Sequence, residues 1–311
     1  MKKKIFIDGK AGTTGLRIEE RLSGRCDVEI ISLPEELRKD PYARREMLNS
    51  ADIVFLCLPD AAAKEAVAMI ENPEVVVIDA STAHRTLDDW AYGLPELAPE
   101  FEEKIKASKR IAVPGCHASG FISLVYPLIK NGFLPSDALL TVHSLTGYSG
   151  GGKAMIADYE SAERSPLLDA PRQYGITQSH KHLPEMVKIT GLEHAPIFCP
   201  IVSDFYSGME VTVPIFKSQL LKGGIEDIKA LYKEIYTTPL LHYTEGGDEG
   251  GLMSAAALAG ADSMQIEVAG NEERILLIAR YDNLGKGASG AAVECLNIKL
   301  GAEKTKTLEV K

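Results

Sequence analysis

The sequence predicts an α/β fold in two domains: a doubly wound parallel sheet, then an α+β domain with a mixed or antiparallel sheet. Three observations support this prediction. Hydrophobic residues make up 45% of the 311 residues, which suits a globular chain of two typical domains. Short β-branched runs alternate with helical patterns as far as residue 115. Beyond it, strand-like segments alternate more clearly and have shorter connections.

The first domain is predicted from its alternating elements. Runs rich in Val, Ile and Phe are typical of strands buried on both faces, and they occupy residues 5–8, 28–31, 52–56, 75–78 and 110–113. Helical patterns lie between them, at residues 13–23, 60–71 and 97–107. Strands that alternate with helices form βαβ units, so this domain is expected to be of Rossmann type.

The second domain is predicted from strands with one polar face, at residues 138–144, 195–202, 209–216, 264–269 and 274–281. Residues 287–300 carry Ala and Leu at helical spacing, and we expect a helix there that returns to pack on the first domain. We therefore place the first domain at residues 1–116 plus about 286–311, and the second, the catalytic domain, at residues 117–285.

Composition excludes several classes of protein. The formal net charge of −10 argues against nucleic-acid binding, which needs a basic face. No apolar run approaches the roughly 20 residues of a membrane-spanning helix. The basic residues 2–4 lead directly into a short strand, which is too short for the apolar part of a signal peptide. A cytoplasmic protein without nucleic-acid or membrane partners is expected.

A glycine-rich loop joins the first strand to the first helix. Its spacing is G-x-x-G-x-x-G, and the residues that we expect to hold a pyrophosphate are Gly9, Gly12, Thr13, Thr14 and Gly15. Glycines let the backbone approach a phosphate closely, and a helix N-terminus offers free N–H groups to it. A purely structural turn is the alternative, but the position between strand and helix favours a dinucleotide site.

The second strand indicates which dinucleotide binds. NAD sites usually carry an acidic residue at its end, whereas here the strand ends at Ser32 and Leu33. Ser32 could bond a 2′-phosphate, and Arg38 or Lys39 could reach it. NADP is therefore favoured over NAD. The competing interpretation is that Arg38 and Lys39 lie on a solvent-exposed face of a helix.

The five cysteines are widely spaced and form no C-x-x-C pair, which argues against a disulfide framework and a metal site. Cys116 differs from the others because Pro-Gly precedes it and an apolar helix follows. A thiol at a helix N-terminus is exposed to free N–H groups, which favour the thiolate and can bind an oxyanion. We predict that Cys116 is a nucleophile.

A thiolate nucleophile needs an acid–base partner. His180, His182 and Glu185 lie within six residues and provide the best candidates. Metal binding is the competing interpretation, but an H-x-H pair has no third ligand near it in the sequence. Residues two apart diverge on a strand and on a helix, so we expect only one of the two histidines to face Cys116.

Five motifs together resemble the N-acetyl-gamma-glutamyl-phosphate reductases, in the shorter of that family's two sequence types, within the semialdehyde dehydrogenase superfamily. They follow one another along nearly the whole chain, at residues 8–16, 114–120, 147–153, 180–185 and 282–290. Members of the long type carry an aromatic residue and Pro-Thr after the cysteine, whereas this chain has His117-Ala118-Ser119. That departure leaves the nucleophile intact.

The resemblance implies an NADPH-dependent, phosphorylating aldehyde dehydrogenase of arginine biosynthesis. It would reduce N-acetyl-L-glutamyl 5-phosphate to the 5-semialdehyde through a thioester on Cys116 and release inorganic phosphate. His180 would be the acid–base residue, with His182 as its rival and Glu185 as the supporting carboxylate.

Further site residues are expected on the same basis. Ser81, Asn283 and Gly287 would contact the cofactor. The phosphate and carboxylate of the substrate need cations, for which Arg85, Lys153 and Lys181 are candidates. The competing interpretation is that each is an ordinary surface charge. A homo-oligomer, dimer or tetramer, is also expected.

Two alternatives remain open at this point. One is another acyl-phosphate reductase, of the aspartate-semialdehyde dehydrogenase or lysine-pathway type, with the same chemistry and a different substrate pocket. The other is a non-catalytic, NADP-binding redox sensor with Cys116 as its switch. Reduction of NADP by an aldehyde in the presence of phosphate would separate an enzyme from a sensor.

Overall fold

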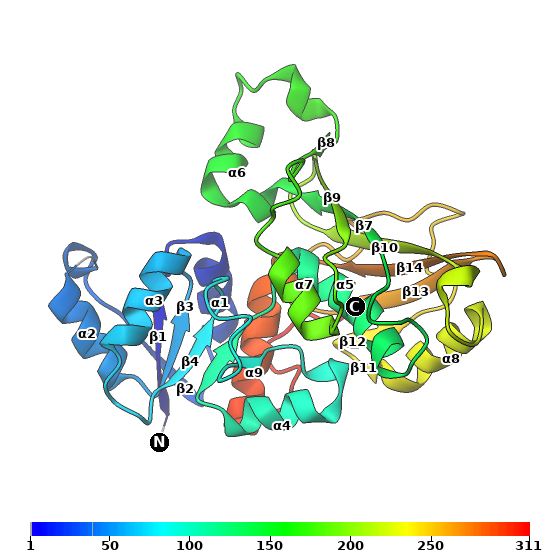
Figure 1. Ribbon diagram of the computed structural model, residues 1–311. Coiled ribbons are helices and arrows are strands. Elements are labelled where there is room, and N and C mark those ends of the chain that lie inside the picture. Colours follow the sequence, from blue (N-terminus) through cyan, green and yellow to red (C-terminus); the bar gives the residue numbers. More distant parts are fainter. Residues whose placement is uncertain (1, 39) are drawn as a thin grey trace. The chain divides into compact units, whose positions relative to one another are not determined.

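The computed structural model describes residues 2–38 and 40–311 and divides the chain into two compact units (Figure 1). The first unit comprises Met1–Pro95, Pro99–Pro114 and Ala288–Leu308. The second comprises Glu96–Ala98, Gly115–Gly287 and Glu309–Lys311. Most of the C-terminal segment thus belongs to the same unit as the N-terminus.

The first unit is built on a parallel sheet in the order β2-β1-β3-β4-β6-β5, with every pair of neighbours parallel. Its strands are β1 (Lys3–Asp8), β2 (Val28–Ile31), β3 (Ile53–Leu56), β4 (Val76–Asp79), β5 (Ala91–Tyr92) and β6 (Arg110–Ala112). Its helices are α1 (Thr13–Leu22), η1 (Glu35–Leu37), α2 (Pro41–Ser50), α3 (Asp60–Met69), α4 (Pro99–Ala107) and α9 (Gly290–Leu300).

Helices cover both faces of this sheet, because successive side chains of a strand point to opposite sides. Ile53 and Phe55 of β3 pack with residues of α1, α4 and α9. Val54 and Leu56, which alternate with them, pack with residues of α2 and α3. The two apolar clusters explain why these strands are continuous hydrophobic runs.

The second unit contains an eight-stranded mixed sheet in the order β11-β12-β13-β14-β10-β7-β9-β8. Its strands are β7 (Thr141–Gly147), β8 (Arg172–Gln173), β9 (Ile197–Ser203), β10 (Met209–Phe216), β11 (Thr237–Thr238), β12 (Leu241–Tyr243), β13 (Met264–Gly270) and β14 (Arg274–Tyr281). The β7–β9 and β12–β13 pairs are parallel, and the others are antiparallel. The predicted fold class is therefore confirmed in both parts.

Helix α5 (Cys116–Lys130) packs against β10 and β14 and is almost entirely buried. It contacts α7 (Leu183–Thr190) and α8 (Ile225–Ile235). Two buried tyrosines of α8 bind its backbone: Tyr232 donates to the carbonyl of Leu124, and Tyr236 donates to that of Ser123. The remaining helical segments are η2 (Pro95–Leu97), η3 (Tyr148–Gly151), α6 (Gly152–Glu160), η4 (Pro166–Asp169), η5 (Lys217–Gln219) and the π-helix η6 (Gly285–Ser289).

The structure differs from the sequence prediction in several elements. Helix α2 was not predicted, because its sequence is polar and only Leu48 is buried. The strand expected at residues 138–144 lies three residues later, as β7. The expected C-terminal helix begins as a π-turn before α9. Among the residues that the structure describes, no helix is long and apolar enough to cross a membrane.

Candidate active site

The thiol of Cys116 lies at the first position of α5. Gly115 caps the helix in an extended conformation and has no side chain to occupy the end. The first N–H groups of a helix have no partner within it, so they are available near the thiol. Cys116 is half-buried, whereas most of α5 is buried. The position suits a reactive cysteine.

Two further contacts fix this helix start. The carboxylate of Glu185, which is fully buried, accepts a hydrogen bond of 2.8 Å from the backbone N–H of Gly115. Gly287 packs on the cysteine, since a Cβ added at Gly287 would lie 3.1 Å from Cβ of Cys116. Glu185 was predicted to support the acid–base histidine, and the structure places it against the cap of the nucleophile helix.

Three histidines gather beside this helix start. The ring centroids of His180 and His182 are 4.8 Å apart, and that of His117 lies 5.9 and 5.5 Å from them. Phe198 packs on His117 and His180. The two rings of the H-x-H pair do not diverge as expected, whereas which of them faces Cys116 stays a prediction. A turn at residues 181–182, rather than a strand or a helix, joins them, so their rings meet.

His117 lies at the centre of a hydrogen-bond chain. Its Nδ1 is 2.6 Å from Oγ of Ser144, and its Nε2 is 2.6 Å from the hydroxyl of Tyr174. Burial lowers the pKa of His117 to about 3, with a contribution from the charges of His180 and Lys181. His117 is therefore neutral at physiological pH, and it links Ser144 to Tyr174 through hydrogen bonds without carrying a charge.

The other groups near the thiol titrate differently. Burial, and then the charge of Lys181, lowers the pKa of His180. Burial and the nearby Cys116 raise the pKa of Tyr174 above its usual range. A neutral His180 can accept a proton near neutral pH, whereas Tyr174 remains a hydrogen-bond donor. Lys181 is exposed beside this cluster.

Sequence reasoning missed three members of this site. His117 directly follows the nucleophile, and a histidine at that position could have been predicted from the sequence to belong to the site. Tyr174 and Ser144 come from distant segments and carry no local pattern. Their contribution could be found only in the folded chain.

The glycine loop of the first unit is shaped as a phosphate cradle. Gly9 has φ +86°, and a Cβ on it would lie 2.2 Å from the carbonyl oxygen of Cys57. The amide of Gly12 bonds the carbonyl of Gly9 at 2.9 Å and closes the loop. A Cβ on Gly15 would lie 2.7 Å from that same carbonyl. Thr13 and Thr14 open α1 directly after this loop.

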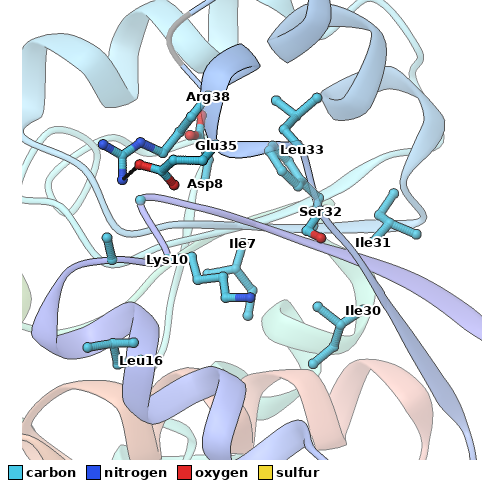
Figure 2. Close-up of a pocket in the computed structure, with 13 residues that line it drawn as sticks. Ile7, Asp8, Lys10, Leu16, Ile30, Ile31, Ser32, Leu33, Glu35 and Arg38 are labelled. Atoms are coloured by element: carbon cyan, nitrogen blue, oxygen red, sulfur yellow. Dashed lines mark ion pairs between the residues drawn. The ribbon is translucent and has the colours of Figure 1, made fainter.

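A pocket of about 270 Å³ lies against this loop (Figure 2). Such a space is large enough for a nucleotide base or ribose, and its walls are mostly apolar. Its lining residues are Phe6, Ile7, Asp8, Gly9, Lys10, Ala11, Leu16, Ile30, Ile31, Ser32, Leu33, Glu35 and Arg38. The loop and the pocket together fit a dinucleotide.

The polar rim of this pocket includes the residues predicted to bind a 2′-phosphate. Ser32 and Arg38 both line it. Arg38 is half-exposed and forms an ion pair of 3.0 Å with Glu35, drawn as a dashed line in Figure 2. Lys39, the third residue of that prediction, lies outside the described residues.

Ser81 and Arg85 serve the framework of the first unit. Ser81 donates to Asp79 at 2.7 Å, and the same carboxylate bonds Nδ1 of His84. Arg85 is buried and donates to the carbonyls of Val113 and Ala80. Lys153, by contrast, is exposed on α6. Lys181 lies between His180 and His182 in the chain and is exposed.

Asn283 lies in a buried polar network of the second unit. Its amide donates to Oγ of Ser149 at 3.0 Å, and its oxygen accepts from the backbone of Gly208 at 2.9 Å. Asn283 was predicted to contact the cofactor, and both its amide nitrogen and its amide oxygen are thus hydrogen-bonded within the second unit. In the described part of the chain, no group of three or more His, Cys, Asp or Glu side chains is arranged to hold a metal ion.

Comparisons with known proteins first define the class. Two family models match: the NAD binding domain of semialdehyde dehydrogenases at residues 11–106, and their dimerisation domain at residues 116–283. Aspartate semialdehyde dehydrogenase II of Vibrio cholerae has a similar fold, with a TM-score of 0.75 at 16% identity over 97% of this chain and 99% of that one. The enzyme of Candida albicans gives 0.64 at 16%, with coverage of 97% and 99%.

Curated relatives then identify the family. N-acetyl-gamma-glutamyl-phosphate reductase 2 of Pseudomonas putida is 44% identical over 96% of this chain and 97% of its own length. The reductase of Rhizobium meliloti is 44% identical, with coverage of 97% and 100%. That of Nostoc sp. is 42% identical, with coverage of 96% and 97%. The chain belongs to the N-acetyl-gamma-glutamyl-phosphate reductase family.

Proposed function

We propose that this chain reduces N-acetyl-L-glutamyl 5-phosphate to N-acetyl-L-glutamate 5-semialdehyde and inorganic phosphate, with NADPH, in arginine biosynthesis. The carrying observation is the placement of Cys116 at the start of α5, beside the cluster of His117, His180 and His182. Family membership supports the substrate.

The first step forms a bond between the sulfur of Cys116 and the acyl carbon. The thiolate attacks, the carbon–oxygen bond to the phosphoryl group breaks, and inorganic phosphate leaves with the electron pair. The N–H groups at the start of α5, which have no partner within the helix, can bind the negative oxygen of the tetrahedral intermediate. Lys181 supplies a cation near the histidines for an anionic group of the substrate.

The second step releases the aldehyde. When bound, the nicotinamide cofactor supplies the hydride that reduces the thioester. His180, which takes the proton of the Cys116 thiol in the first step, gives that proton to the oxyanion that hydride addition leaves. It takes the proton back as the carbon–sulfur bond breaks with its electron pair going to sulfur, and it can then return the proton to the thiolate. Its lowered pKa leaves the imidazole neutral, and therefore able to accept that proton, at physiological pH.

We propose NADP rather than NAD as the cofactor. The rim of the pocket carries Ser32 and Arg38 and no acidic residue at the tip of β2. Two acidic residues do line the pocket, and each is ion-paired: Glu35 with Arg38, and Asp8 with Arg44. We further assign cofactor binding to the first unit and the chemistry to the second, whose main segment begins at Gly115 and so contains Cys116, one residue before the range expected from the sequence.

A homo-oligomer, dimer or tetramer, in the cytoplasm completes the proposal. One observation supports the assembly: the face of the second sheet opposite α5 exposes apolar side chains of three strands, Ile197, Phe216 and Leu276. Strands of one sheet present alternate residues to the same face, so these side chains share a surface.

Steady-state kinetics tests the proposed reaction. NADP reduction is followed with a panel of semialdehydes in the presence of phosphate. N-acetyl-glutamate semialdehyde should be the best substrate, and Cys116→Ser should lose several powers of ten in turnover but still bind NADPH. A preference for aspartate semialdehyde would identify another acyl-phosphate reductase. Absence of turnover with every aldehyde would favour a redox sensor.

A further inference from the structure

The hydroxyl of Tyr281 lies within the first turn of the nucleophile helix. Tyr281 ends β14 and is fully buried. Its hydroxyl donates to the carbonyl oxygen of Cys116 and accepts a bond of 3.1 Å from the backbone N–H of Gly120. In a regular α-helix these two backbone groups are bonded to each other, because N–H(i) pairs with C=O(i−4). The hydroxyl of Tyr281 therefore lies between the carbonyl of Cys116 and the N–H of Gly120 and bonds to both.

Gly120 leaves the space that this hydroxyl occupies. A Cβ added at Gly120 would lie 2.7 Å from the hydroxyl oxygen of Tyr281 and 2.8 Å from Cγ2 of Val211. Glycine is costly inside a helix, so its presence in the second turn of α5 has a local reason. Here the reason is the approach of β10 and β14 to the helix backbone.

The hydroxyl keeps its proton. Burial raises the pKa of Tyr281 well above its usual value, and the nearby charge of Cys116 raises it further. Tyr281 is thus a constant donor to the carbonyl of Cys116. That carbonyl shares its peptide unit with the N–H of His117, and a hydrogen bond to one end of a peptide strengthens the donor at the other end.

We propose that Tyr281 is a positioning residue for Cys116. Its hydroxyl sets the tilt of the peptide that joins Cys116 to His117, and it strengthens the N–H of that peptide, which is one of the first N–H groups of the helix. This inference rests on the proposed function, because that function makes Cys116 the nucleophile. It assigns to β14 a part in the reactivity of a thiol on α5.

The test compares two Tyr→Phe variants that each lose a hydroxyl group bonded to α5. Tyr281→Phe removes both hydrogen bonds at the first turn, to Cys116 and Gly120. Tyr232→Phe removes the bond to Leu124, eight residues further along the same helix, and serves as the matched control. The readout is the rate of alkylation of Cys116 by iodoacetamide across pH 5.5–9.5, followed by mass spectrometry of the Cys116 peptide.

Tyr281→Phe should slow alkylation at pH 7 by about tenfold, equivalent to an upward shift of about one pH unit in the profile. Turnover should fall by a similar factor while KM for NADPH stays unchanged. Tyr232→Phe should lower Tm without moving the alkylation profile. An unchanged profile in Tyr281→Phe, or an equal shift in Tyr232→Phe, would overturn the proposal.

Gly120→Ala tests the same contact from the other side, and it decides the matter if Tyr281→Phe does not fold. The added methyl group displaces the hydroxyl, and alkylation should slow in the same direction. An unchanged profile in a folded Gly120→Ala protein would also overturn the proposal. Alkylation needs no substrate, so it tests the role of Tyr281 independently of the proposed reaction. If the variants shift the alkylation profile but the wild type does not turn over the acyl phosphate, the proposed function is refuted and the role of Tyr281 is not.

Discussion

At the residue scale, the site depends on the reactivity that each side chain acquires from its neighbours. Cys116 is exposed to the N–H groups at a helix start, and His180 has a lowered pKa because it is partly buried beside Lys181. His117 is more deeply buried and is neutral throughout the physiological range. His117 and His180 are therefore chemically distinct although they share one cluster, which makes their roles separable by mutation.

The pH dependence of turnover should identify the acid–base histidine. His180→Asn should cut turnover by about a hundredfold or more and remove the acidic limb of the pH profile. Because the pKa of His180 is lowered, that limb lies below pH 6.5 in the wild type and activity falls as pH decreases through it. His182→Asn should be milder. The reverse pattern, measured over pH 5–9, would transfer the role to His182.

Cofactor preference should depend on Arg38. Removing its charge with Arg38→Ala should weaken NADPH binding by about tenfold and leave NADH binding nearly unchanged, because only NADPH carries the 2′-phosphate. Glu35→Gln, which removes the competing carboxylate, should strengthen NADPH binding. Fluorescence titration measures both affinities. Equal affinities of the wild type for the two cofactors would refute the 2′-phosphate assignment.

At the element scale, segment ends decide where functional groups lie. The loop after β1 and the start of α5 both follow strands of the first sheet. A side chain would clash at Gly9 and Gly15 in the first case, and at Gly120 in the second turn of α5. The π-turn η6 presses Gly287 against Cys116. Its Lys286 is buried and ion-paired with Glu96 of η2, which anchors the turn within the second unit.

Removing one partner of this ion pair should destabilise the protein more than removing both partners. Lys286→Met leaves the Glu96 carboxylate buried without its cation and should cost about 3–5 kcal/mol of unfolding free energy. The double variant Lys286→Met with Glu96→Gln should recover most of that loss, since no charge remains buried. Urea unfolding of the three proteins measures the difference. A double variant as unstable as the single one would contradict this account.

At the scale of the whole molecule, burial couples the site to global stability. The fully buried His117 must stay neutral in the folded chain, where its pKa is about 3, but can take a proton when unfolded. Folding then favours the neutral form. The contribution is complete above the unfolded value of about 6.5 and is lost as pH falls toward 3.

Acid should therefore destabilise the wild type through His117. One extra proton in the unfolded state reduces the unfolding free energy by up to about 1.4 kcal/mol per pH unit below pH 6.5. His117→Asn should lower stability at pH 8 but reduce this slope between pH 6 and 5. The exposed His143→Asn is the control and should leave the slope unchanged. Equal slopes in wild type and His117→Asn, from urea unfolding at each pH, would refute the prediction.

Local patterns in the sequence determined the fold class and the start of the site. Buried apolar runs indicated the parallel strands, because both faces of such a sheet are covered. The placement of Cys116 before a helix followed from Pro-Gly and the apolar run after it. These features depend on neighbours within a few residues, and such neighbours can be read from the chain. Helix α2 was missed because its sequence is polar and buries little.

Tertiary structure alone decided which groups surround the thiol. Ser144, Tyr174 and Tyr281 come from separate segments, and pairing across a sheet and packing against α5 bring them together. Folding also buried Arg85 against backbone carbonyls within the first unit, and it brought the rings of His180 and His182 into contact within the second. The sequence determines which residue types are available, whereas burial and long-range contacts determine their charge and orientation, since both depend on atoms far apart in the chain.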